Sequence, residues 1–196
     1  MAPLAILGIM VGLAGIVILL GLVVLVLLWL VVAYNGLVRL RNRVREAWAQ
    51  IDVQLKRRYD LIPNLVETVK GYAAHERETL ERVIKARQAA IDATGVAQQA
   101  QAENMITSAL RQIFALSEAY PNLKANENFL ALQEELSSTE NKIGFARQYY
   151  NGEVRSLNTR IETFPTNIIA RLFNFQQAEF FELQDAAQRE APKVKF

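Results

Sequence analysis

The hydrophobic positions of this chain fall into two patterns, one continuous and one periodic. The continuous pattern runs from Leu4 to Ala33, where no residue is charged. As a helix this stretch is about 45 Å long, compared with about 30 Å for the hydrocarbon layer of a bilayer. The sequence therefore predicts a transmembrane anchor over residues 1–33. A cleaved signal peptide is the alternative, but it would have a basic start, and no Lys or Arg precedes Arg39.

The charges around the anchor predict its orientation. Only the terminal amine is positive on the N-terminal side, whereas a run of basic residues follows the anchor: Arg39, Arg41, Arg43, Arg45, Lys56, Arg57 and Arg58. Cytoplasmic flanks carry such an excess, so the N-terminus is expected outside and the rest of the chain in the cytoplasm. Trp29 and Tyr34 fit an aromatic belt at the inner interface. The arginines either hold anionic lipid headgroups or only set the topology.

Small residues line one face of the predicted anchor. They recur at steps of three or four: Ala5, Gly8, Gly12 and Gly15. Such a stripe lets two membrane helices approach closely, which favours self-association of the anchor. The alternative is that glycine is simply common in membrane helices.

The periodic pattern begins beyond Tyr34. Apolar residues recur there every three or four positions, without sustained alternation, which predicts an all-α body over residues 34–185. We expect the first helix to leave the membrane and continue to about Arg58. Asp60 would then cap a second helix with Pro63 in its first turn, ending near Ala93 before Gly95. One helix kinked at Pro63 is the alternative.

Two further helices complete the predicted body. The third covers Val96 to Ala119 and is stopped by Pro121. Asn126 can cap a fourth helix of about 35 residues, or some 50 Å, which ends at "TFPTN" (Thr163 to Asn167). Such a length suits an elongated antiparallel bundle with a long, coiled-coil-like helix.

Phenylalanine is concentrated near the C-terminus. Five of the nine phenylalanines lie in this part: Phe164, Phe173, Phe175, Phe180 and Phe181. This segment could fold back on the bundle, contact a neighbouring subunit or lie on the membrane. Residues 186–196 are expected to form a flexible tail.

Composition narrows the chemistry that the chain can perform. A net charge of +2 provides no large basic field, so we expect no nucleic-acid partner, and the absence of cysteine excludes thiolate chemistry. His75 is the single histidine, and "HERE" at His75 lacks the second histidine of an HExxH zinc motif. We expect His75 to be a surface or half-buried helix residue. The sequence contains no P-loop, GxGxxG or GxSxG motif.

The remaining charged residues are expected to be structural. Glu134 and Glu135 are adjacent on a helix, diverge by about 100° and fit a solvated face. Arg57 and Arg58, together with Asp60, would pin the helix junction. We therefore predict no catalytic, cofactor-binding or metal-binding residues, no cofactor and no enzymatic activity.

Several long runs resemble a known family. They are "YNGLVRLRNRVREAWAQIDVQLKRRYDLIPNLVETVKGYAAHE" from Tyr34, "ARQA" from Ala86, "AYPNLKANENFLALQEEL" from Ala119, "ENKIGFARQYYN" from Glu140 and "LNTRIETFP" from Leu157. In this order they resemble the LemA family of bacterial membrane proteins. The resemblance implies one N-terminal transmembrane helix in the bacterial inner membrane, an outward N-terminus and a helical cytoplasmic domain. The family carries no established catalytic residues.

Three functions are compatible with these features. The first is a membrane-anchored scaffold that self-assembles through its anchor, its long helices and the Phe-rich segment, and organises membrane lipid or partner proteins. The second is a monomeric or dimeric adaptor for another membrane protein, such as an envelope-stress protease or a sensor. The third, an enzyme or small-ligand binder, is disfavoured by the residue inventory.

Overall fold

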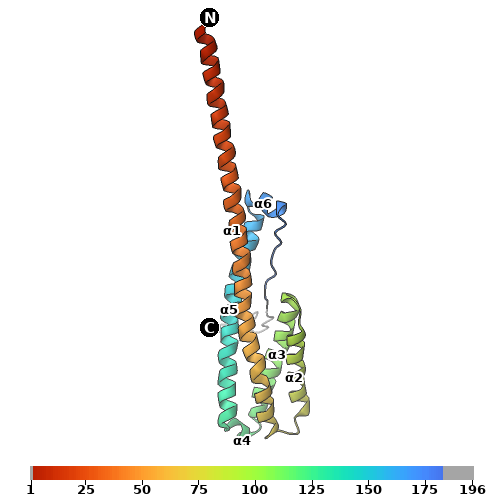
Figure 1. The fold of residues 1–196 in the computed structure, drawn as a ribbon. Helices are drawn as coiled ribbons and strands as arrows, with labels where there is room; N and C mark the ends of the chain where they lie inside the picture. Colours follow the sequence, from red (N-terminus) through yellow and green to blue (C-terminus); the bar gives the residue numbers. More distant parts are fainter. Residues whose placement is uncertain (1, 183–196) are drawn as a thin grey trace, which may run out of the picture. The chain divides into compact units, whose positions relative to one another are not determined.

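The computed structural model describes residues 2–182, and side chains at position 13 and from 15 to 182. Its ordered elements are all helices: α1 (Ala2–Lys70), α2 (Arg77–Asp92), α3 (Val96–Ser117), α4 (Pro121–Lys124), α5 (Glu127–Glu162) and α6 (Thr166–Leu172) (Figure 1). The predicted all-α fold is confirmed. The expected tail at 186–196 and the side-chain surroundings of Gly8 and Gly12 lie outside the described residues.

The first helix is longer than the sequence predicted. The expected break between Asp60 and Pro63 is wrong, because α1 continues through both residues to Lys70. Pro63 has no N–H, so the Tyr59 carbonyl one turn earlier loses its usual helical donor. Arg87 of α2 donates from Nε to this carbonyl at 2.8 Å. A side chain from the next helix thus replaces the missing main-chain donor, and α1 remains one helix.

The second helix consequently starts later than expected. A turn spans Gly71 to Glu76, and the Val69 carbonyl accepts hydrogen bonds from the amides of Tyr72 and Ala73. His75 lies exposed in this turn, so its predicted place on a helix is wrong.

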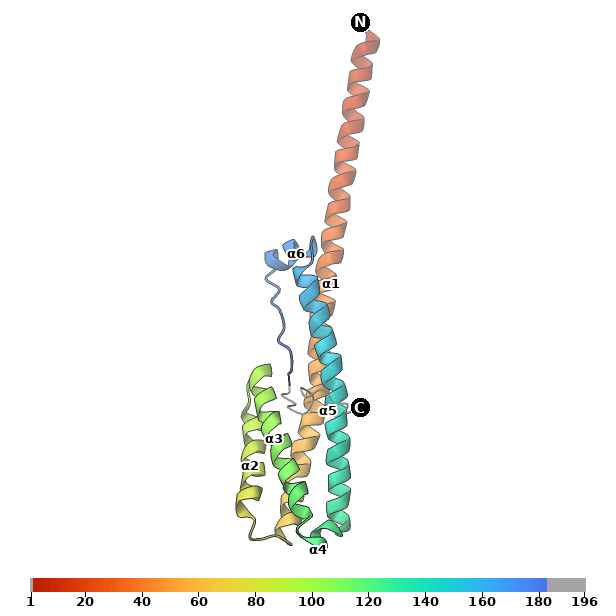
Figure 2. The same ribbon diagram turned by 180° about the vertical axis from the view of Figure 1, so that it is seen from behind.

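One compact unit of the chain consists of Val44–Arg155 and the segment from Ala178. Within it, the end of α1, then α2, α3 and the first part of α5 run alternately in opposite directions, as in an antiparallel four-helix bundle (Figures 1 and 2). Its core draws on each of these helices and on α4: Ile62, Leu65, Val69, Leu80, Val83, Ile106, Ile113, Leu123, Phe129 and Leu136. Burying each large apolar side chain contributes about 1.5–3 kcal/mol.

The predictions for the later helices are confirmed. α3 runs from Val96 to Ser117, and α5 has 36 residues. Asn126 caps α5, because its Oδ1 accepts a hydrogen bond from the Phe129 amide at 2.9 Å. Gly95, at the N-cap of α3, has a φ of +85°. That value lies outside the range that side-chain-bearing residues usually adopt.

The other compact unit contains α1 up to Arg43, together with Ser156–Gln177. Both views place α6 beside α1 within this unit (Figures 1 and 2). The Tyr34 ring packs on Phe173, with 4.8 Å between ring centroids, and on Phe175 at 5.8 Å. Arg41 lies over the Phe175 ring, 5.2 Å from its centroid, which is within cation–π range.

Part of the Phe-rich segment also packs in the bundle unit. Phe181 is fully buried, and its ring meets Trp48 edge-on at 5.4 Å. Asn151 holds its backbone, with Oδ1 accepting from the Phe181 amide at 2.9 Å and Nδ2 donating to the Phe181 carbonyl at 3.2 Å. Folding back on the bundle is therefore confirmed for Phe181, whereas Phe175 packs against α1 in the other unit. The other three rings are partly or largely exposed: Phe164 at 76%, Phe173 at 53% and Phe180 at 40%.

Candidate functional site

A charged cluster lies inside the bundle unit, centred on Arg58. The Arg58 side chain is 1% exposed. Its Nη1 lies 2.7 Å from Glu140 Oε2 and 3.4 Å from Glu103 Oε2, and its Nη2 donates to Thr107 Oγ1 at 2.7 Å. Helices α1, α3 and α5 are thus joined by one buried guanidinium.

Glu103 is the fully buried member of this cluster, with no exposed side-chain surface. The Tyr59 hydroxyl donates a hydrogen bond to Glu103 Oε1. Gln99 Nε2 donates to the same oxygen at 3.0 Å and to the Tyr59 hydroxyl oxygen at 2.8 Å. Each polar group in this part of the interior is thereby paired, as buried polar groups must be to avoid a large desolvation cost.

Burial shifts the pKa of both the Glu103 carboxyl and the Tyr59 hydroxyl. It raises the pKa of the Glu103 carboxyl, while the Arg58 charge and the Tyr59 and Gln99 hydrogen bonds act in the opposite direction. It also raises the pKa of the Tyr59 hydroxyl, and the Glu103 charge adds to that effect. Tyr59 therefore remains a proton donor at physiological pH.

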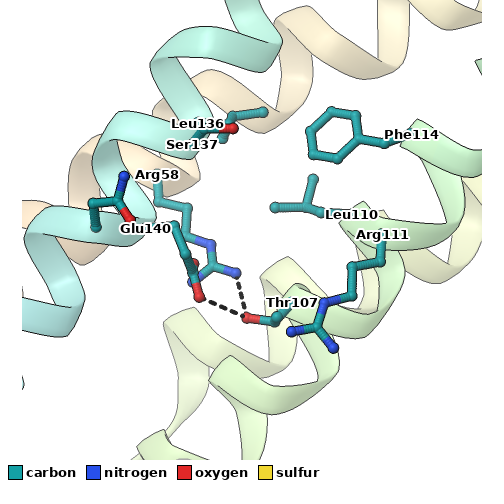
Figure 3. Close-up of a pocket in the computed structure, with 9 residues that line it drawn as sticks. Arg58, Thr107, Leu110, Arg111, Phe114, Leu136, Ser137 and Glu140 are labelled. Atoms are coloured by element: carbon teal, nitrogen blue, oxygen red, sulfur yellow. Dashed lines mark hydrogen bonds and ion pairs between the residues drawn. The ribbon is translucent and has the colours of Figure 1, made fainter. Parts of the chain in front are cut away.

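A cavity of about 260 Å³ opens beside the cluster (Figure 3). Arg58 enters from α1, Thr107 and Arg111 from α3, and Glu140 from α5, while Leu110, Phe114 and Leu136 form an apolar wall. Arg58 already meets two carboxylates and a hydroxyl here. Its charge is compensated within the chain by groups of α3 and α5, so the cluster ties these helices to α1.

The sequence interpretation missed this cluster. Arg57 and Arg58 were expected to pair with Asp60, but Arg58 is buried against Glu103, and Arg57 pairs with Glu135 near the surface. One signal was available in the sequence. Arg58 stands three residues after Leu55 and four before Ile62, and both of those are fully buried. The position therefore lies on the core-facing stripe of α1.

The other singled-out residues do not converge. His75 is exposed in its turn and Glu134 is exposed on α5, while Glu135 is half-buried beside Arg57. Within the described residues, no three His, Asp or Glu side chains gather in a way that could hold a metal ion. The expectation that the chain uses no metal or cofactor stays a prediction.

A shallow apolar groove lies elsewhere on the bundle, between α1 and α5. Its most exposed apolar residues are Val53, Phe145 and Tyr149, and Phe145 has 71% of its surface open. Gln50, Gln54, Lys142 and Ala146 complete the lining. The Gln54 Oε1 atom is buried there and has no hydrogen-bond partner among the described residues. We refer to these seven residues as the α1–α5 groove.

Comparison with known proteins identifies the family. Residues 47–196 match the LemA family. The chain belongs to the LemA family. It is 28% identical to Protein LemA of Metamycoplasma hominis, over 77% of this chain and 69% of that protein. It is also similar to two magnetosome proteins: MamQ 2 of Paramagnetospirillum magneticum at 22% identity and MamQ of Magnetospirillum gryphiswaldense at 21%, each over 80% of this chain and 67% of the relative.

The exposed side chains of α1 identify the part of this LemA-family chain that can cross a membrane. α1 contains one stretch long and apolar enough to cross a bilayer. Large apolar side chains from Leu13 to Val32 are exposed along it, as they would be when facing lipid tails. Together with the family, this makes the chain a membrane-associated helical protein.

Proposed function

We propose that this LemA-family protein is a membrane-anchored scaffold that self-assembles through the α1–α5 groove. It is held in the bacterial inner membrane by α1, with its N-terminus outside and the bundle in the cytoplasm. The assembled bundles then organise the surrounding lipid or partner proteins. The excess of arginine after the anchor supports this orientation.

The groove is the observation that carries the proposal. Phe145 and Tyr149 of α5 and Val53 of α1 leave apolar surface uncovered on one face of the bundle. Aromatic side chains in such a position are typical anchors of protein interfaces.

A second copy of the chain is the occupant that fits this groove. In a contact across a two-fold axis both copies present the same surface patch, so the apolar lining of one groove would meet that of the other. The same symmetry would place each Phe145 against the apolar lining of the other groove. An interface of this kind can add to contacts made by the small-residue stripe of the anchor.

The test is the mass of the full-length protein in mild detergent, measured by light scattering after size exclusion. We expect a discrete oligomer for the wild-type chain and a smaller particle for Phe145→Asp. The matched control is Leu130→Asp, which places the same charge at an exposed apolar position of α5 outside the groove. Helical content of each variant is checked by circular dichroism.

Two results would overturn the proposal. One is a wild-type protein that stays monomeric at micromolar concentration, which would leave the adaptor as the better hypothesis. The other is an oligomer that Phe145→Asp leaves unchanged, since the assembly would then use a different surface.

A further inference from the structure

We propose that the segment from Phe164 to Phe173 is a second membrane contact, seated in the bilayer interface next to the point where α1 leaves the membrane. It goes beyond self-assembly, because its partner is the lipid surface. The segment contains α6 and lies in the same compact unit as the first part of α1.

The apolar exposure of this segment is high for its length. Phe164 is 76% exposed, Leu172 72%, Ile168 56% and Phe173 53%. Ile168 and Leu172 are four residues apart and so share one face of α6. An uncovered cluster of large apolar side chains marks a surface that meets a protein or a membrane.

The opposite face of α6 is already occupied. Thr166, Ile169 and Ala170 are buried, each with at most 2% of its surface exposed. α6 is therefore held against the rest of its unit by one face and presents the other outward. A short helix fixed in this way cannot rotate to hide Ile168 and Leu172 without losing its own packing.

Two ring contacts with Tyr34 fix the depth of α6 relative to the membrane-spanning part of α1. Tyr34 directly follows the continuous apolar stretch that ends at Ala33 and stands five residues before Arg39, so its ring belongs at the interface, where tyrosine is enriched. Phe173 lies 4.8 Å from that ring and Phe175 lies 5.8 Å from it. The apolar residues of α6 are thereby tied to the boundary between lipid tails and headgroups.

The charges of this unit favour anionic headgroups as the partner. Its basic residues are all exposed: Arg39, Arg41, Arg43, Arg160 and Arg171. Glu162 is the one acidic residue in the same two sequence stretches, and it accepts a hydrogen bond from Gln177 Nε2 at 2.6 Å. Exposed basic residues in the same unit as exposed apolar ones are typical of segments that lie in the interface of an anionic membrane.

The absence of cysteine allows a direct depth measurement on the full chain. Leu172→Cys labelled with an environment-sensitive fluorophore is reconstituted in nanodiscs of phosphatidylethanolamine and phosphatidylglycerol, one chain per disc. We expect blue-shifted emission that doxyl-labelled lipid quenches. Met105→Cys is the matched control, an exposed apolar position on α3 of the bundle unit, and should be neither shifted nor quenched. Val31→Cys, in the span, is the positive control.

Three outcomes decide the proposal. Quenching at position 172 with one chain per disc supports it, and weaker quenching in discs of phosphatidylcholine alone supports the role of the arginines. No quenching at position 172, with quenching retained at 31, overturns it. A blue shift that appears only when several chains share a disc, without lipid quenching, also overturns it, because a second copy would then cover α6. The single-chain discs keep this test independent of self-assembly.

Discussion

Arg87 of α2 donates from Nε to the carbonyl oxygen of Tyr59 in α1 at 2.8 Å. This is the carbonyl that Pro63 leaves without its usual main-chain donor, four residues later in the same helix. The contact explains how a proline stands inside a helix that runs on to Lys70. It also fixes α2 against α1 by a bond to the backbone, which does not depend on the identity of the Tyr59 side chain.

Replacing Arg87 should destabilise the bundle through this carbonyl. We expect Arg87→Ala to cost about 1–2 kcal/mol, because the partly buried acceptor loses its donor. In thermal melts of the detergent-solubilised chain, this corresponds to roughly 2–8 °C. Pro63→Ala restores a main-chain N–H, so the cost of Arg87→Ala should be smaller in that background. Equal costs in the two backgrounds would contradict the assignment. Arg82→Ala, an exposed arginine of the same helix, is the control.

Sequence patterns predicted the regular parts of this fold well and its exceptions poorly. The spacing of apolar residues places α3 and the whole of α5, and the side-chain chemistry of Asn126 marks the start of α5. These features depend on residues close together in the chain. The local preference of proline for the first turn of a helix predicts a new helix at Pro63. In the structure, the hydrogen bond from Arg87 of another helix outweighs that preference, and α1 continues.

The buried cluster was missed for a related reason. Arg58 and Glu103 are 45 positions apart, so no local pattern pairs them. A charged residue on an apolar stripe is informative, but only the fold reveals whether it points inward to a partner. The α1–α5 groove is also a feature that local patterns do not reveal, because the exposure of Phe145 depends on which face of α5 the bundle leaves uncovered.

The Glu103 carboxyl should make stability depend on pH in an unusual direction. Burial raises its pKa above the ordinary 4.5, so its contribution is fully present below that value and is lost as the pH rises through the folded-state pKa. The melting temperature of the wild type minus that of Glu103→Gln should therefore be largest below about pH 4.5 and shrink as the pH rises toward neutral. A difference that grows with pH would show that Arg58 outweighs burial. Glu118→Gln, at an exposed position, reports the general effect of removing one acidic charge.

Removing Arg58 from the same cluster should lower the free energy of unfolding by more than removing the Glu103 charge does. Arg58→Ala leaves Glu103 buried without its cation, and breaking a buried pair from one side costs about 3–5 kcal/mol. We expect thermal melts to show a loss of more than about 6 °C, at roughly 2–4 °C for each kcal/mol. The double variant Arg58→Met with Glu103→Gln should recover part of that loss, since no uncompensated charge is then buried. Failure of the double variant to exceed Arg58→Ala would argue against burial of the charge as the cause.

The cap of α5 can be tested with two substitutions at one position. Asn126→Ala removes the acceptor of the Phe129 amide and should cost about 1 kcal/mol. Asn126→Asp keeps an acceptor at the helix N-terminus and should retain most of the stability. Asn122→Ala, at an exposed position of α4, is the control. If the Asn126→Asp and Asn126→Ala variants had the same melting temperature, the side chain at position 126 would not be acting as the cap.

The end of α6 depends on the left-handed backbone of Asn174, which has a φ of +52°. Its amide donates to the Arg171 carbonyl at 3.2 Å and the Phe175 amide donates to the Ala170 carbonyl at 2.8 Å, the pair of bonds that defines a Schellman cap. The cap turns the chain so that Phe175 returns to Tyr34.

Asn174→Val should cost about 1–2 kcal/mol of stability, because a branched side chain is strained in this conformation, whereas Asn174→Gly should be neutral or stabilising. Hydrogen exchange at the Phe175 amide measures the effect locally: protection should fall for Val, hold for Gly and be intermediate for Ala. Equal protection in all three variants would mean that packing of Phe175, not the backbone of Asn174, holds this turn.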